Sequence, residues 1–205
     1  DSHRAVLAGI DAAIEAGFDN VKLDTVVMRG VNDDELSDLI DYGRRSRLEV
    51  RFIEYMDVGG ATQWSNEAVV SRHEMLSTLS ENYGLITPVK ELNSAPADRF
   101  TLLDGTIFGI ISSTTQPFCR SCDRSRLTAD GIWYLCLYAH SGTDLRKSLR
   151  EGASIDDLQD QIKSVWQERV DRGAEIRLSE GQREPLIPVR RLREEPHLEM
   201  HTRGG

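Results

Sequence analysis

The sequence has few cysteines, no long apolar run and little excess positive charge, and each shortage excludes a class of protein. Only three of the 205 residues are cysteine, and all three lie in one short segment. A secreted disulfide framework usually has an even number of cysteines spread over its loops, so we do not expect one here. No apolar run reaches the roughly 18 residues that a membrane-spanning helix needs.

The net charge and the first residues indicate the cellular location and the classes of partner to expect. The formal net charge is −9, so no basic surface for a nucleic acid is expected. Residues 1–18 include acidic side chains and lack the small-residue cleavage site of a signal peptide. We therefore expect a cytoplasmic protein with neither a membrane nor a nucleic acid as its partner.

The first third of the chain alternates helix and strand signals. Apolar positions in residues 3–16 predict a helix that ends at Gly17, and residues 21–28 are rich in β-branched side chains, typical of a strand. A second helix is expected after a cap at Asp33 or Asp34, and residues 48–56 predict a second strand. This order favours βα units and a parallel sheet.

The rest of the chain has a different pattern. A helix is predicted over 71–84, paired strands over 99–113, and a second hairpin turn at Asp130-Gly131. Residues 154–173 predict a helix that begins with Ser154 and Asp157 as a capping pair and ends at Gly173. Its expected inward positions are Leu158, Ile162, Val165, Trp166 and Val170.

All three thiols lie in the segment CRSCDRSRLTADGIWYLCLYAH, residues 119–140. The spacing C-x2-C-x13-C is typical of metal ligands, because two thiols separated by two residues can converge on one metal centre. With His140, the set forms a Cys3His zinc site, which would make the segment a structural or binding module without catalysis. Alternatively, three thiolates hold an iron–sulfur cluster and leave one iron open to substrate. Three unrelated buried thiols are the third interpretation.

Two arginines stand directly after the second cysteine. In an extended segment, Arg124 and Arg126 project to the same side, next to the metal. Guanidinium groups offer planar pairs of N–H donors that match phosphate oxygens, so the pair could hold a polyphosphate.

The segment PFCRSCDRSRLTADGIWYLCLY, residues 117–138, closely resembles the C-terminal cluster motif of the GTP 3′,8-cyclase family (molybdenum cofactor biosynthesis protein A). These radical S-adenosylmethionine enzymes open molybdenum cofactor biosynthesis. DAAIEAGFDNVKLDTVVMRGVND, RFIEYMDVGG and the terminal Gly204-Gly205 also resemble that family, in the same order. The resemblance covers essentially the whole chain.

The resemblance implies a reaction and its participants. A 5′-deoxyadenosyl radical formed from S-adenosylmethionine abstracts the 3′ hydrogen of GTP, and the ribose radical attacks C8 of guanine. The product is (8S)-3′,8-cyclo-7,8-dihydroguanosine 5′-triphosphate, which cyclic pyranopterin monophosphate synthase then converts. The implied cofactors are a C-terminal [4Fe–4S] cluster, S-adenosylmethionine and a second, N-terminal [4Fe–4S] cluster, and a homodimer is one expected assembly.

The resemblance also assigns roles to single residues. The ligands of the C-terminal cluster would be Cys119, Cys122 and Cys136. The residues that contact GTP would be Lys22, Arg124, Ser125 and Arg126. Met56 would contact S-adenosylmethionine, Arg51 would be an active-site arginine, and Gly204 and Gly205 would enter the active site.

For the fold, the resemblance implies the C-terminal part of an incomplete (βα)6 radical S-adenosylmethionine barrel in residues 1–114. An α+β iron–sulfur and GTP-binding region with the double-glycine tail would follow in residues 115–205. The family's N-terminal C-x3-C-x2-C motif is absent from this sequence, so we expect this chain alone not to cleave S-adenosylmethionine. Asp24 and Arg203 depart from the family pattern, which has Asn and an aliphatic residue at these positions.

Overall fold

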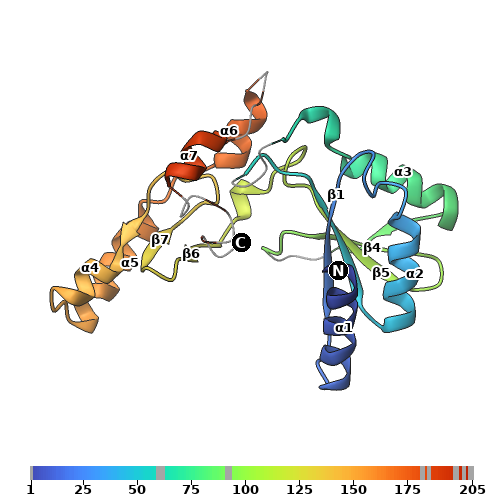
Figure 1. The fold of residues 1–205 in the computed structure, drawn as a ribbon, viewed down its shortest axis with the longest axis horizontal. Coiled ribbons are helices and arrows are strands. Elements are labelled where there is room, and N and C mark those ends of the chain that lie inside the picture. The colour runs from blue at the N-terminus through green and yellow to red at the C-terminus, as the bar shows by residue number, and fades with distance from the viewer. Residues whose placement is uncertain are drawn as a thin grey trace. The chain divides into compact units, whose positions relative to one another are not determined.

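The computed structural model describes residues 2–58, 63–90, 94–180, 183, 186–195, 199 and 202. The chain divides into two compact units, whose helices and strands are drawn in Figure 1. The first unit comprises Asp1–Glu54 and Val70–Ile111, and the second comprises Tyr55–Val69 and Ser112–Gly205. The predicted boundary between residues 114 and 115 stays a prediction.

The first unit is built on a mixed sheet. Its elements are α1 (Ser2–Glu15), β1 (Lys22–Val27), α2 (Leu36–Ser46), β2 (Glu49–Glu54), α3 (Arg72–Tyr83), β3 (Thr87–Pro88), β4 (Asp98–Thr101) and β5 (Ile107–Ile111). The strand order is β1-β2-β5-β4-β3. β1, β2 and β5 run parallel, while β4 and β3 are antiparallel to their neighbours. The predicted α/β class and the parallel pairing of the first two strands are confirmed.

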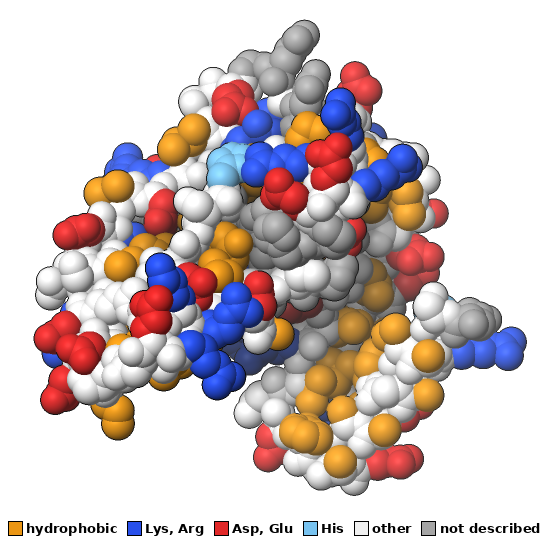
Figure 2. Space-filling view, turned by 60° about the vertical axis from the view of Figure 1, so that its left-hand side comes forward, with side chains coloured by type: hydrophobic (Ala, Val, Ile, Leu, Met, Phe, Trp, Pro, Cys, Tyr) orange, Lys and Arg blue, Asp and Glu red, His pale blue; other side chains and the backbone are white. Residues whose placement is uncertain are grey.

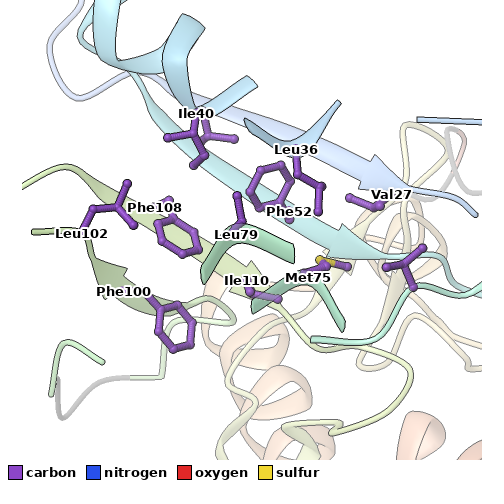
Figure 3. Packing of buried hydrophobic residues seen from close by; sticks show 12 residues of the cluster. Val27, Leu36, Ile40, Phe52, Met75, Leu79, Phe100, Leu102, Phe108 and Ile110 are labelled. Carbon is purple, nitrogen blue, oxygen red and sulfur yellow. The ribbon is translucent and has the colours of Figure 1, made fainter. Parts of the chain in front are cut away.

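One face of this sheet carries the hydrophobic core. Side chains from β2, β5, α2 and α3 point toward one another (Figure 3), and Phe52, Met75, Leu79, Phe108 and Ile110 are fully buried. Phe108 lies between two other rings, stacked on that of Phe100 at 5.5 Å and edge-on to that of Phe52 at 6.3 Å. Each such side chain stabilises the fold by about 1.5–3 kcal/mol when it leaves water.

The other face of the sheet is lined by charged side chains. Lys22 and Glu49 are register partners, as are Asp24 and Arg51, so all four side chains share one face. Gly109 is the next partner of Arg51, and a Cβ there would lie 3.2 Å from Cγ of Arg51. The glycine therefore leaves room for the arginine side chain.

Helix α1 leaves part of its apolar surface exposed. It spans Ser2–Glu15, one residue earlier at each end than the predicted range 3–16; none of its residues is buried, and Val6 and Ile14 are 54% and 40% exposed. Figure 2 shows hydrophobic side chains along the helical segment at the lower right. Within the residues that the structure describes, no helix has the length and apolar character to cross a membrane.

The second unit combines short strands with helices. Its elements are η1 (Asn66–Ala68), η2 (Cys119–Ser121), β6 (Arg126–Leu127), β7 (Ile132–Tyr134), β8 (Thr143–Asp144), α4 (Leu145–Arg150), α5 (Ile155–Gln167), α6 (Gly173–Ser179) and α7 (Val189–Glu194). The strands form an antiparallel sheet in the order β6-β7-β8. The predicted turn is present, with Gly131 at a φ of 86° that favours glycine.

Three predicted helix details are wrong. Helix α2 begins after Glu35 without a side-chain cap, because Asp33 accepts a hydrogen bond from the Gly30 N–H instead (2.7 Å). Helix α5 ends at Gln167, and Gly173 begins α6 rather than ending α5. Val170 is 89% exposed because it lies beyond the end of α5. The predicted start of α5 is confirmed, since Ser154 and Asp157 form a complete capping box.

Candidate functional site

The three thiols lie on short segments of the second unit. Cys119 begins the single turn η2 and Cys122 caps its end, so that turn fixes the spacing of the first two. Cys136 follows β7. All three are free thiols and half-buried. They come from the two segments that the sequence pattern indicates, and none is engaged in a disulfide.

Two guanidinium groups point at the sulfur of Cys122. Nη2 of Arg124 lies 3.7 Å from Sγ, and Nη2 of Arg169 lies 3.6 Å from it. The Arg124 guanidinium also stacks on Phe118, with its carbon 4.5 Å from the ring centroid. Positive charge and N–H donors are therefore concentrated beside one predicted ligand.

These neighbours change the acidity of the thiols. Burial disfavours the Cys122 thiolate, but the N–H groups of Arg124 and Arg169 outweigh it and lower the pKa of Cys122. Burial raises the pKa of Cys136, and the nearby negative charge of Asp171 raises it further.

The backbone of Gly173 packs closely against Cys136. A Cβ on Gly173 would lie 3.0 Å from the Cys136 sulfur and 2.4 Å from Cβ of Tyr138. No side chain fits at position 173 unless one of these neighbours moves. The soft donor set of three thiols and the guanidinium groups beside Cys122 are the donor chemistry that three-thiolate ligation of an iron–sulfur cluster would use.

The described residues do not form a complete metal-binding group. Within that part of the chain, no three His, Cys, Asp or Glu side chains are close enough together to hold one ion. His140 is exposed, so the Cys3His arrangement is not assembled either. The assignment of the three cysteines as ligands stays a prediction.

The predicted nucleotide-binding segment has the expected alternation. Arg124 and Arg126 are half-buried, whereas Ser125 between them is exposed. Arg126 lies on β6 opposite Tyr134, which fixes its direction. Arg124 precedes the strand, so a shared side for the two arginines stays a prediction.

The other predicted residues belong to different parts of the chain. Lys22, which is exposed, and Arg51 lie on the charged face of the first unit's sheet. Nε of Arg51 donates to Glu49 at 2.8 Å, and Glu49 also accepts from Arg99 at 2.8 Å. Met56 is half-buried in the second unit. Gly204, Gly205 and Arg203 lie outside the described residues.

Beside Met56 is a buried polar network that the sequence pattern did not predict. Asp57 is fully buried, and its carboxylate accepts from the Tyr138 hydroxyl (3.0 Å) and from Nε of Arg177 (2.7 Å). The Asp57 carbonyl accepts from the Leu186 N–H at 2.8 Å. This single residue ties Met56 to the segment after Cys136 and to α6. No local pattern signals this network, because the partners of Asp57 lie 81 and 120 residues away in the sequence.

Comparison with known proteins identifies the family to which this chain is similar. A family model described as Molybdenum Cofactor Synthesis C matches residues 48–175. The whole chain is 58% identical to a protein of Mycobacterium bovis named GTP 3′,8-cyclase 3 and covers 54% of it. It is 56% identical to GTP 3′,8-cyclase 1 of Mycobacterium tuberculosis, covering 57%. A GTP 3′,8-cyclase of Acidothermus cellulolyticus is 42% identical over 87% of the chain and 51% of the relative. The chain thus spans about half the length of these curated relatives.

Proposed function

The chain belongs to the Molybdenum Cofactor Synthesis C family, and on that premise we propose that it is the substrate-binding C-terminal part of a GTP 3′,8-cyclase. The observation that carries the proposal is the arrangement around Cys122. Of the three free thiols in the second unit, that of Cys122 stands beside two guanidinium groups, which favour a thiolate and match phosphate oxygens. The parallel strands of the first unit would be the later strands of an incomplete (βα)6 barrel. The full-length enzyme would work in the cytoplasm.

Under this proposal, Cys119, Cys122 and Cys136 hold a [4Fe–4S] cluster. Bound to three thiolates, such a cluster supplies one iron that is open to a ligand such as a guanine. The protein itself would position GTP: Arg124 and Arg126 donate N–H groups to the phosphates, assisted by Ser125 and Lys22. Holding the nucleotide at both ends fixes the ribose, so that the reacting carbon faces its partner without a search.

Met56 would contact S-adenosylmethionine. The next residue, Asp57, is fully buried and bonded to Tyr138, which would hold Met56 in place. The homodimer and the transfer of product to cyclic pyranopterin monophosphate synthase are part of the same proposal.

The test uses the full-length protein that contains this chain, prepared anaerobically. With two clusters, the wild type should hold about eight irons per chain, and Cys136→Ser should hold about four. One tightly bound zinc that requires His140 would replace this proposal with the structural-module interpretation.

Arg124→Ala then tests the phosphate assignment without touching a cluster ligand. We expect unchanged iron and GTP binding weakened about tenfold to a hundredfold, because a charge-assisted hydrogen bond contributes about 1.5–3 kcal/mol. Binding of guanosine should change little. Arg190, whose side chain is 89% exposed, provides the matched control as Arg190→Ala. Equal losses for GTP and guanosine would remove Arg124 from the phosphate site.

A further inference from the structure

Arg169 lies beyond the end of α5, outside every motif that the sequence pattern singles out. Its side chain is only 11% exposed. Nη1 donates to the carbonyl of Arg124 at 3.0 Å, and Nη2 donates to the carbonyl of Leu135 at 2.8 Å. Nη2 also lies 3.6 Å from the Cys122 sulfur. One guanidinium therefore contacts three segments of the predicted site.

Two further contacts fix the guanidinium itself. Nε donates to Asp171 at 2.8 Å, and the guanidinium carbon lies 4.9 Å from the centroid of the Trp166 ring. Trp166 in turn stacks on Trp133 of β7 at 6.2 Å. A group held from its edge and its face loses little further freedom when it binds its acceptors.

The three acceptors are significant because of their places in the sequence. Cys122 is a predicted ligand, Arg124 begins the predicted phosphate-binding segment, and Leu135 directly precedes the third predicted ligand. Movement of any one of these segments would break a bond to Arg169. The spacing between the thiols and the phosphate-binding segment is thus set by a residue that belongs to neither.

We propose that Arg169 is a positioning residue that holds Cys122, the backbone of Arg124 and the approach to Cys136 in one frame. This inference rests on the proposed function, because it takes the cysteines as cluster ligands and Arg124 as a phosphate contact. Arg169 itself need not touch the nucleotide. It sets the cluster ligands and the phosphate contact at a fixed separation before GTP arrives.

The choice of arginine follows from geometry. Carbonyl oxygens of two segments, a carboxylate and a sulfur surround one planar group whose donors point in fixed directions. A lysine would retain a positive charge near the sulfur, but its three donors on one nitrogen could not span the same acceptors. Arg169→Lys therefore separates the effect of the positive charge from the effect of the hydrogen bonds that join the three segments.

The test compares wild type, Arg169→Gln and Arg169→Lys in the full-length protein, with Arg190→Gln as the exposed control. Iron release to a chelator should be on the order of tenfold faster in both Arg169 variants, because each loses the bonds that join the ligand segments. The Kd for GTP should also rise about tenfold in both, since Arg124 loses its backbone anchor.

A reduction potential supplies the readout that a purely structural role would not change. An N–H donor and positive charge at a cluster sulfur stabilise the more negative, reduced form, so Arg169→Gln should shift the potential of this cluster to a more negative value. Arg169→Lys keeps the charge and should shift it less. The second cluster expected in the full-length protein serves as the internal reference and should keep its potential.

The outcomes separate the two proposals. If the wild type holds no second set of irons or does not bind GTP, the proposed function fails. If the wild type does both, and Arg169→Gln matches it in iron release, GTP affinity and potential, the positioning role is refuted while the function stands. If Arg169→Gln does not fold, the result for Arg169→Lys decides. If neither variant folds, Arg169 is required for folding of the whole unit, and the proposal is overturned.

Discussion

The buried carboxylate of Asp57 offers a sharp test of the described packing. Asp57→Asn keeps the size of the side chain but removes its charge and turns one acceptor into an NH2 donor. With the amide oxygen kept toward Tyr138, the NH2 group would face Nε of Arg177, which donates to Asp57 at 2.7 Å, and two donors would oppose each other; in the flipped orientation Arg177 would meet a neutral oxygen instead of a charged carboxylate. The Arg177 guanidinium, 14% exposed, would lose its buried counter-ion.

The magnitude follows from what remains after the substitution. Removing one partner of a buried ion pair costs about 3–5 kcal/mol. Arg177 keeps its contact with Glu180, and the Tyr138 hydroxyl keeps an oxygen acceptor. We therefore expect the lower end, about 3 kcal/mol, for opening of α6. Arg177→Met combined with Asp57→Asn should cost less than Asp57→Asn alone, because the second change removes the charge that has lost its buried counter-ion.

Hydrogen exchange in the full-length protein measures this locally. Amides of α6, such as that of Ile176, which donates to Arg172 at 2.9 Å, should exchange on the order of 100-fold faster in Asp57→Asn. Asp160→Asn changes an exposed carboxylate of α5 and should leave α6 unaffected. Unchanged α6 protection in Asp57→Asn, or a double variant at least as destabilised as the single one, would refute the reasoning.

Three further predictions concern packing and pH. Gly173→Ala should destabilise the protein by about 1–3 kcal/mol, although alanine favours helices, because its Cβ would meet Tyr138 at 2.4 Å. The control Gly9→Ala in α1 has open space around it and should stabilise the protein by up to about 1 kcal/mol. Thermal unfolding measures both changes. Hydrogen bonds from the Ser71 N–H and hydroxyl, assisted by Arg29, lower the pKa of Glu74 from 4.5 to about 2. The contribution of Glu74 to stability is therefore complete above pH 4.5 and is lost as the pH falls toward 2. Glu74→Gln should show a weaker acid dependence of Tm. Burial and the Asp57 carboxylate raise the pKa of Tyr138. The free energy of unfolding should therefore fall above about pH 10, where only the unfolded tyrosine ionises. In urea titrations, Tyr138→Phe should lose less of its free energy of unfolding at alkaline pH than the wild type.

The sequence predicted those features that depend on neighbouring residues. Ser154 and Asp157 are three residues apart and form a capping box whatever the rest of the chain does, so the start of α5 was predictable. The turn at Gly131 depends on an equally local pattern, the Asp130-Gly131 pair.

Features set by distant contacts could not be predicted in this way. Helix α5 ends at Gln167 because the residues after it are drawn into other bonds, with Arg169 donating to carbonyls 45 and 34 residues away. Gly173 resembled a helix stop, but its role is to avoid Tyr138. The cysteine spacing and the resemblance both indicated the thiols and Arg124, whereas Arg169 and Asp57 emerge only from the fold, since no local spacing connects them to their partners.

The two arginines beside Cys122 differ in how their donors are used, and this difference assigns their roles. Arg169 commits its N–H groups to two carbonyls and a carboxylate, so taking a phosphate would require it to give up protein contacts. Arg124 makes one contact with the sulfur and stacks on Phe118, and its Nε, among the described residues, is buried without a hydrogen-bond partner. A buried donor without a partner is costly, and an oxygen acceptor from a ligand would remove that cost. Anion binding is therefore expected of Arg124, and a fixed frame of Arg169.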